Sequence, residues 1–357
     1  MDRVYNFNAG PSAMPLKVLQ EARAEFLNYK NTGMSIIEMS HRSPEYAAMH
    51  AETKALLRQL MEIPEDYEIL FIQGGGSLQF LMTAANFFTN KRAAYANTGV
   101  WAKKAMAEAK RFGEAYEACT SAGKNHSYIP QELTIKPDTA YLHITANNTI
   151  YGTQWQDFPD VSVPVICDMS SDILSRPVDV KKFSLIYAGA QKNLGPAGVV
   201  IVIVKKAFLE TARTDLPPML SYQNYADNDS LYNTPPVFAI YMVNKTLHWI
   251  KAQGGVKAIA AHNREKAQLI YDVIDASRGF YRGHAEKASR SLMNITFNLP
   301  TQELEKDFIA EGKKRGFIGI GGHRLVGGCR VSAYNAVTTE ACRALADFMK
   351  EYQAKHE

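Results

Sequence analysis

The chain has 357 residues, of which 46% are hydrophobic and 21% charged, and its formal net charge is +4. This composition is typical of a globular protein with one or two domains, and so small a charge gives no case for a nucleic-acid partner. The four cysteines form no C-x-x-C pair, the first residues include no apolar leader and no apolar run reaches 18 residues, so we expect a cytoplasmic protein without a membrane span.

Taken in chain order, the sequence predicts helices and strands in alternation. Helices are expected over residues 15–29, 44–60, 78–87, 101–111, 238–251, 256–276, 303–315 and from 339 onward. Strands are expected over residues 67–72, 93–96, 140–144, 163–168, 185–188, 199–204, 293–297 and 329–332. The alternation ends near residue 210 and a smaller α+β segment follows, which predicts an α/β protein with a large doubly wound domain and a C-terminal domain.

The first candidate catalytic residue is Lys192, in a glycine-bordered turn between the predicted strands at 185–188 and 199–204. Burial disfavours the ammonium form of lysine, so an amine held in such a turn becomes a nucleophile. Attack on an aldehyde would give a Schiff base, the linkage by which enzymes hold pyridoxal phosphate. The alternative is a lysine whose side chain simply extends from a strand end into solvent.

Asp168 is the second candidate, because it ends the predicted strand at 163–168, where open α/β sheets bind their ligands. Pyridoxal phosphate needs an acid at its ring nitrogen. The separation from Lys192 (192 − 168 = 24 residues) leaves room for a loop and one short strand. Asp168 alone could equally cap a following helix. Together with Lys192 it predicts a pyridoxal phosphate site.

Three glycines, at 74–76, separate the predicted strand at 67–72 from a helix. Backbone N–H groups in such a loop, together with the helix N-terminus, bind phosphate. A nicotinamide site is disfavoured, because Gln79 occupies the place of the third glycine in the dinucleotide motif. Trp101, at the start of the next helix, is either a face for stacking on a ring or a core residue.

Five separated motifs resemble those of the class V aminotransferases, which are fold-type-I pyridoxal phosphate enzymes. In order along the chain they are residues 6–11, 38–42, 188–198, 232–236 and 322–330. The resemblance covers in effect the whole chain, with the family region expected at 4–346. It implies a mostly parallel seven-stranded sheet flanked by helices in a large cofactor-binding domain, 16–260. A smaller α+β domain would combine residues 1–15 and 261–357.

The resemblance also implies a cofactor site without a metal. Lys192 would form the internal aldimine with pyridoxal phosphate, and Asp168 would hold the pyridine nitrogen. The other implied contacts are Trp101 on the ring, Thr149 at the ring's 3-oxygen, Gly76, Ser77 and Gln191 at the phosphate, and Asn233 and Thr234 at the same phosphate from a second subunit. The protein would therefore be a homodimer with shared active sites.

For the substrate, the resemblance implies that Arg330 binds the α-carboxylate, where a planar two-point contact suits a guanidinium. His323 and Arg324, with His41 and Arg42 of the second subunit, would surround the substrate phosphate or side-chain carboxylate. Ser77 stands where some members of the family have an arginine that contacts the phosphate, and a lost charged hydrogen bond would weaken binding by about 1.5–3 kcal/mol.

The implied reaction is the reversible transfer of the amino group of L-glutamate to 3-phosphohydroxypyruvate. It gives O-phospho-L-serine and 2-oxoglutarate, in serine biosynthesis. A second implied activity is the formation of 4-phosphohydroxy-L-threonine in pyridoxine biosynthesis.

Three alternatives remain open at this stage. A class V enzyme of the alanine–glyoxylate type would share Lys192 and Asp168. A cysteine desulfurase would need a reactive cysteine on a mobile loop, whereas Cys329 lies in a predicted strand. The last alternative is a non-catalytic scaffold or a dinucleotide-binding oxidoreductase, which would not bind pyridoxal phosphate.

Overall fold

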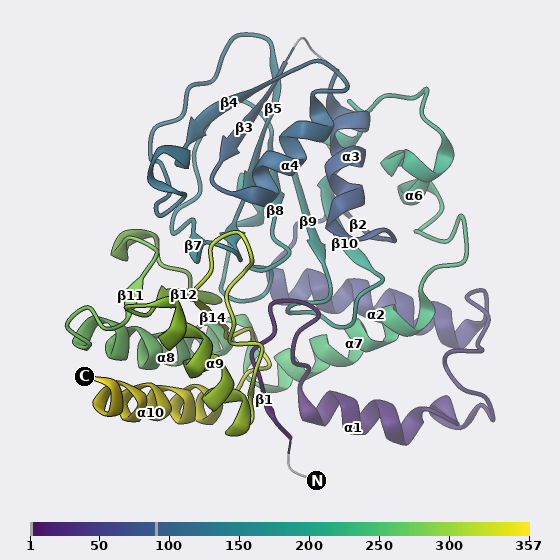
Figure 1. Cartoon of the computed structure of the whole chain (residues 1–357). Coiled ribbons are helices and arrows are strands. Elements are labelled where there is room, and N and C mark those ends of the chain that lie inside the picture. Colours follow the sequence, from purple (N-terminus) through teal and green to yellow (C-terminus); the bar gives the residue numbers. More distant parts are fainter. Residues whose placement is uncertain (1–2, 90–91) are drawn as a thin grey trace.

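The protein is built on a seven-stranded sheet with the strand order β2-β10-β9-β8-β5-β3-β4 (Figure 1), seen in a computed structural model that describes residues 3–89 and 92–357. The strands are β2 (Tyr67–Ile72), β3 (Arg92–Asn97), β4 (Glu114–Thr120), β5 (Thr139–Thr145), β8 (Val165–Asp168), β9 (Leu185–Gly189) and β10 (Val200–Lys205). From β4 to β9 all neighbours pair in parallel, whereas β10 is antiparallel to both β9 and β2. The predicted mostly parallel sheet of seven strands is therefore confirmed.

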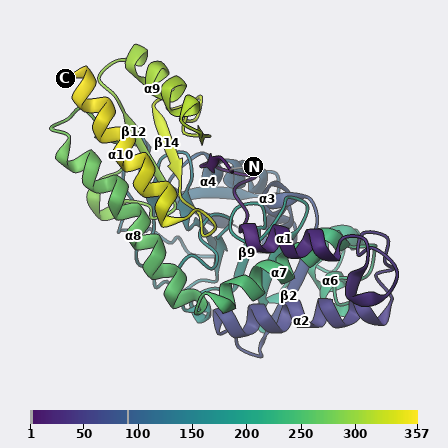
Figure 2. The ribbon, with the colours of Figure 1, turned by 90° about the horizontal axis from the view of Figure 1, so that it is seen from below.

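Helices cover both faces of this sheet, which is why its strands are apolar almost throughout. Along β2, Leu70 and Ile72 pack under α3 (Gly75–Phe87), α4 (Val100–Ala109) and α6 (Tyr222–Asp227). The alternate residues Ile69 and Phe71 belong to the opposite core, with α1 (Leu16–Glu25), α2 (Pro44–Met61) and α7 (Val237–Ala252). Seen from below, α7 lies between α1 and α2 (Figure 2).

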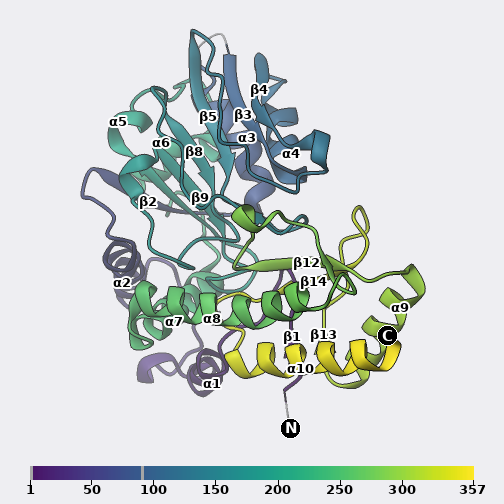
Figure 3. The same cartoon turned by 90° about the vertical axis from the view of Figure 1, so that its left-hand side faces the viewer.

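A second core lies in the C-terminal part of the chain. There α8 (Gly255–Ala276) packs beside α10 (Thr339–His356), and both lie near the three-stranded sheet β11-β12-β14 (Figure 3). Its strands are β11 (Arg282–Gly283), β12 (Asn294–Asn298) and β14 (Cys329–Ser332), and α9 (Gln302–Lys314) completes the layer. The first strand of the chain, β1 (Tyr5–Asn6), pairs with β13 (Phe317–Ile318) and so packs with this core. The domain limits 16–260, with 1–15 and 261–357, stay a prediction.

The remaining elements are short. They are β6 (Asn147–Asn148), β7 (Thr153–Gln154), α5 (Lys206–Leu209) and the 3-10 turns at Tyr29–Asn31, Ala122–Lys124, Val180–Lys182, Pro218–Leu220 and Lys287–Ser289. Within the two described ranges, no helix combines the length and the apolar character needed to cross a bilayer.

Some boundaries differ from the prediction. The helix expected over 15–29 ends at Glu25, and the helix expected from 78 begins at Gly75, so two of the three glycines lie in its first turn. Strand β4 was not predicted, because Glu114 and Glu117 of this edge strand are exposed and interrupt the alternation of apolar and polar residues. Glycine has poor helix propensity and glutamate poor strand propensity, so the local pattern was misleading at both places.

Lys266 connects α8 to the loop that follows β14. Its ammonium donates hydrogen bonds to the carbonyl oxygens of Ala333 (3.1 Å), Tyr334 (2.8 Å) and Val337 (2.9 Å), and the side chain is only 1% exposed. Burial lowers the pKa of Lys266 to about 8. The charge is tolerated there because all three of its donors are paired.

The loop held by Lys266 reaches the central sheet. The backbone N–H of Asn335 donates to Asn193 Oδ1 (3.1 Å), and the hydroxyl of Tyr334 donates to the carbonyl of Ala9 (2.8 Å). Asn193 follows Lys192 directly. The second core therefore fixes the segment that contains the candidate lysine.

Replacing Lys266 with Met is expected to lower the free energy of unfolding by about 3 kcal/mol, because three buried carbonyl groups lose their donor. Lys257→Met on the same helix, where the side chain is exposed, is the matched control and should change it by less than about 0.5 kcal/mol. Denaturant unfolding of the two variants measures both values. Equal effects would contradict the role given to Lys266.

Candidate active site

A cavity of about 270 Å³ lies where the strands β5 and β8 end and where α3 and α4 begin. Most of the residues predicted for a cofactor and substrate site line it together: Gly76, Ser77, Trp101, Thr149, Asp168, Gln191, Lys192, His323 and Arg330. Because parallel strands end at one edge of the sheet and helices start there, backbone donors and polar side chains converge at this edge.

Lys192 lies in the tight turn between β9 and β10. The turn closes through backbone hydrogen bonds from Ala190 N to Val199 O (3.0 Å) and from Gly195 N to Ala190 O (2.9 Å). The lysine stem runs past Gly10, where an added Cβ would lie 3.4 Å from Lys192 Cγ. Burial, opposed by Asp168 and assisted by Arg330, lowers the pKa of Lys192 to about 8. About a tenth of this amine is therefore uncharged at pH 7, far more than for an ordinary lysine.

Asp168 ends β8 and is buried against the cavity floor. Its Oδ1 accepts a hydrogen bond from the backbone N–H of Ser170 (2.9 Å). Burial raises the pKa of Asp168, whereas Lys192, Ser170 and Tyr187 lower it. The carboxylate is thus the negative group of the cavity floor and faces the one lysine that lines the cavity.

Trp101, Thr149 and Arg330 form one wall. The indole N–H of Trp101 donates to Thr149 Oγ1 (3.0 Å), and Arg330 Nη1 donates to the carbonyl of Thr149 (3.2 Å). Burial lowers the pKa of Arg330. The Nε of Arg330 and the hydroxyl of Thr145, another residue of the cavity lining, are buried and have no hydrogen-bond partner among the described residues. Unpaired buried polar atoms of this kind indicate a site built to contact a polar ligand.

The first turn of α3 forms an anion subsite. Gly74 precedes it with φ +87°, and no side chain caps this helix end, so the N–H groups of the first turn remain available. Gly76 and Ser77 line the cavity next to Gln191. Gly76 has no side chain, and a Cβ added there would lie 3.6 Å from Ser170 Oγ. The subsite suits a phosphate group.

Five predicted site residues lie outside this cavity in the single chain: His41, Arg42, Asn233, Thr234 and Arg324. Asn233 and Thr234 lie beside Gln73, whose amide donates to the carbonyl of Thr234 (2.9 Å). Arg324 is close enough to His323 to act on it, because burial first, and then the charges of Arg330, Arg324 and Lys104, lower the pKa of His323.

Several lining residues were missed by the sequence reasoning, among them Gly10, Phe80, Thr145, Asn147, Ser170 and Ser171. The two serines follow Asp168 after a single residue, Met169, so their position after a strand end was a usable signal. Thr145 ends the neighbouring strand β5 and pairs in register with Asp168, which only the strand order reveals.

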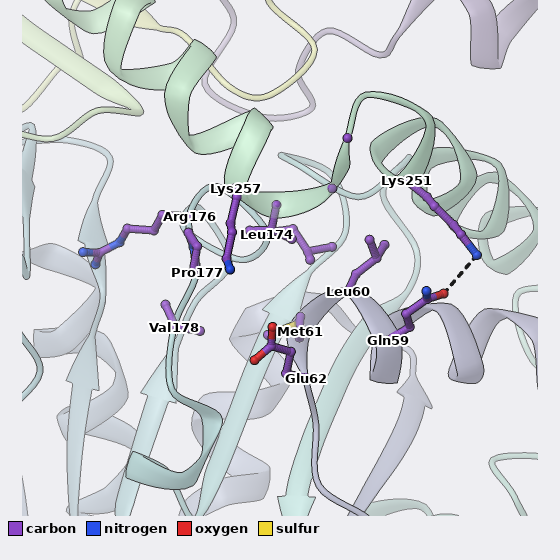
Figure 4. Close-up of a pocket in the computed structure, with 13 residues that line it drawn as sticks. Gln59, Leu60, Met61, Glu62, Leu174, Arg176, Pro177, Val178, Lys251 and Lys257 are labelled. Atoms are coloured by element: carbon purple, nitrogen blue, oxygen red, sulfur yellow. Dashed lines mark hydrogen bonds between the residues drawn. The ribbon is translucent and has the colours of Figure 1, made fainter.

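A larger cavity, of about 590 Å³, lies between the C-terminal end of α2 and the junction of α7 and α8 (Figure 4). Lys251 is paired there with Gln59 (3.0 Å), and Glu62 and Lys257 lie on its rim. Its lining includes none of the residues predicted for the site. We therefore assign the chemistry to the smaller cavity.

Comparison with known proteins identifies the family of the chain. Residues 4–345 match the family model of the class-V aminotransferases. The phosphoserine aminotransferase of Bacillus subtilis (strain 168) is 55% identical, with 100% of both chains covered, and that of Geobacillus kaustophilus (strain HTA426) is 54% identical, with 99% of both covered.

Solved structures of phosphoserine aminotransferases match the fold over nearly the whole chain. The phosphoserine aminotransferase from Bacillus circulans subsp. alkalophilus has a TM-score of 0.98 at 52% identity, with 100% of both chains covered. A pyridoxal phosphate-bound phosphoserine aminotransferase from Trichomonas vaginalis has a TM-score of 0.93 at 39% identity, covering 98% of this chain and 100% of that one. An alanine–glyoxylate aminotransferase from Nostoc sp. shares the fold at a TM-score of 0.75 and 17% identity.

The low pKa of Lys192 leads to a pH prediction. In cofactor-free protein, arylation of Lys192 by fluorodinitrobenzene should accelerate as pH rises through about 8 and then level off, because the free amine is the reactive form. Peptide mapping after brief labelling measures the rate at each pH, with exposed Lys257 as the internal control. A rate for Lys192 that still rises near pH 10 would contradict the prediction.

Proposed function

The chain belongs to the class-V aminotransferases and, within them, groups with the phosphoserine aminotransferases, and we propose that it moves the amino group of L-glutamate to 3-phosphohydroxypyruvate. The products are O-phospho-L-serine and 2-oxoglutarate. The observation that supports this most directly is the convergence of Lys192, Asp168 and Arg330 on one cavity in a chain with full-length relatives of that activity.

The cavity fits pyridoxal phosphate, whose bound ring withdraws electrons from the substrate α-carbon and carries the amino group from one substrate to the other. Lys192 is the residue that would hold the cofactor covalently. The first turn of α3, with Ser77 and Gln191, would bind its phosphate, and Asp168 would face its ring nitrogen. The unpaired hydroxyl of Thr145 and the Trp101–Thr149 pair supply the remaining polar and aromatic surface.

Lys192 and Arg330 would act on different parts of the substrate, its α-carbon and its α-carboxylate. A lysine with a pKa of about 8 can both accept and return a proton near neutral pH, so its Nζ would move the proton at the substrate α-carbon. Arg330 has a guanidinium edge free in the cavity, where it would bind the α-carboxylate in a two-point contact and fix the α-carbon beside the lysine.

The substrate phosphate would be bound by His323 and Arg324 of this chain and by His41 and Arg42 of a second copy. Ser77 provides no cation at the end of the glycine run, so these side chains, at the open side of the cavity, would supply the positive charge. Phosphate and carboxylate anions favour clustered arginine and histidine donors.

A homodimer is supported by the surface near His41 and Arg42. An apolar groove of about 650 Å³ is formed mainly by residues of α1 and α7, and Leu27, which lines it, is 80% exposed. Ile37, four residues before His41, is 53% exposed. Large apolar side chains gathered at a surface mark an interface. We propose that a second copy covers this groove and that its Asn233 and Thr234 reach the phosphate subsite.

Two further parts of the proposal rest on chemistry. The anion-binding groups should also accept the phosphorylated hydroxy-threonine substrate and product of pyridoxine biosynthesis, which differ from the serine pair in carbon skeleton and keep the phosphate.

The four cysteines are free, and three of them are buried thiols, which suits a reducing cytoplasm.

Purified protein with pyridoxal phosphate should convert L-glutamate and 3-phosphohydroxypyruvate to O-phospho-L-serine and 2-oxoglutarate. Lys192→Ala should lower kcat by at least about 10³-fold, because the proton-transfer group is lost. Product formation by chromatography is the measurement. Faster turnover of glyoxylate with alanine than of 3-phosphohydroxypyruvate with glutamate would instead favour the alanine–glyoxylate type of enzyme.

Shared active sites can be tested by mixing two inactive variants. Lys192→Ala and Arg42→Ala homodimers should each be nearly inactive, whereas refolding them together should restore about a quarter of the wild-type activity through one intact site per mixed dimer. Lys192→Ala refolded with Arg330→Ala is the control, because both residues then belong to the same subunit's cavity. It should restore no activity, because in the mixed dimer one cavity lacks Lys192 and the other lacks Arg330. A lack of recovery for Arg42→Ala as well would place Arg42 in the same subunit's site as Lys192.

A further inference from the structure

Three buried side chains lie on one face of three neighbouring strands beneath the cavity. Tyr187 on β9 pairs in register with Asp168 on β8, so the two side chains lie beside each other on the same face. His143 lies on β5, on the other side of β8, and its Nε2 is 2.9 Å from the hydroxyl of Tyr187. Because His143 pairs in register with Ile166, the hydrogen bond crosses β8 between the positions of Ile166 and Asp168.

The protonation state of His143 follows from its surroundings. The ring stacks against Tyr95, with the ring centroids 5.1 Å apart, and Nδ1 is buried without a partner among the described residues. Burial lowers the pKa of His143 to about 3, so the ring is neutral. A buried N–H without an acceptor costs more than a bare ring nitrogen, so the proton belongs on Nε2.

This tautomer fixes the direction of the hydrogen bonds. Nε2–H of His143 donates to the hydroxyl oxygen of Tyr187, and the hydroxyl hydrogen of Tyr187 is then free to point toward another acceptor. Asp168 is the neighbouring acceptor in register, and Tyr187 acts on it in the direction that favours the carboxylate.

We propose that His143 and Tyr187 are positioning residues that keep Asp168 an anion, oriented to pair with the ring nitrogen of the cofactor. This proposal rests on the function proposed above. Neither residue lines the cavity itself, and their effect on the reaction passes through Asp168. The hydrogen bond donated by Tyr187 adds to those of Ser170 in opposing the burial of Asp168, which favours the neutral form that cannot stabilise a protonated pyridine ring.

The other titratable groups around Tyr187 do not supply the hydrogen bond that Tyr187 donates to Asp168. Lys192, from the turn after β9, also favours the carboxylate of Asp168, but covalent attachment to the cofactor would remove its ammonium charge. Around Tyr187 lie Tyr95 on β3, Tyr222 on α6 and Cys167 on β8. Burial raises the pKa of each of these three groups, so all are neutral at physiological pH.

The test compares Tyr187→Phe with Tyr95→Phe. Both variants remove one fully buried hydroxyl from the same face of the sheet, and Tyr95 bonds only toward Tyr141 (2.7 Å), away from Asp168. Tyr187→Phe should weaken binding of pyridoxal phosphate to cofactor-free protein about 10-fold, the effect of one hydrogen bond to a charged group. Tyr95→Phe should change it less than about 2-fold.

A second readout follows the ring nitrogen itself. With ¹⁵N-labelled cofactor in the holoenzyme, the midpoint at which this nitrogen loses its proton should move down by about one pH unit in Tyr187→Phe and stay in place in Tyr95→Phe. A purely structural role for Tyr187 would lower the unfolding midpoint without moving this titration. Equal midpoints and equal affinities for the two variants would overturn the proposal.

A third measurement needs no variant. In ¹⁵N-histidine-labelled wild-type protein, His143 should show the tautomer protonated at Nε2 and should not titrate between pH 5 and 9, with His143→Gln identifying its signal. Protonation at Nδ1, or a midpoint within that range, would overturn the proposal. If wild-type protein does not bind pyridoxal phosphate at all, the proposed function fails, whereas normal wild-type binding with an unaffected Tyr187→Phe rejects only the network.

Discussion

The cavity depends on two opposite charges being taken out of water together. Desolvation alone would leave Asp168 protonated and Lys192 an uncharged amine, and the attraction between them opposes both changes. The balance leaves a carboxylate that can hold a cationic ring and an amine near its titration point. Each group is useful only in the presence of the other. The surrounding structure fixes the distance between Asp168 and Lys192 and excludes water from both.

The reversed direction of β10 has a direct consequence for Lys192. A parallel strand after β9 would need a long crossover connection, usually a helix, whereas an antiparallel partner can follow a short turn. Because β10 is antiparallel, the turn that contains Lys192 is closed by backbone hydrogen bonds at both ends, and its side chain has little freedom. The N-terminal segment restricts it further, since Ser12 Oγ donates to the carbonyl of Lys192 (2.6 Å). The candidate nucleophile is thereby held by segments that lie far apart in the sequence.

Local patterns predicted the parts of this architecture that local physics determines. The buried strands, the glycine run before α3 and the residues Lys192 and Asp168 are all visible as short motifs, and the family resemblance added Trp101, Thr149 and Arg330. Strand order is not a local property, so the register that brings Tyr187 and Thr145 beside Asp168 could not be predicted. The same holds for the groups that a second copy would supply, because a single chain does not contain that interface.

The contacts between the two cores explain why the site needs the whole chain. Arg330 belongs to β14 in the second core, yet it donates to Thr149 in the wall of the cavity. Its position beside Lys192 is therefore set by the loop after β14, which Asn193 contacts from the turn after β9. A shift of the second core would move Arg330, the proposed carboxylate contact, relative to Asp168 at the end of β8. Since a displacement of about 1 Å at a reacting centre can cost about 100-fold in rate, the buried polar contacts between the cores are part of the catalytic geometry.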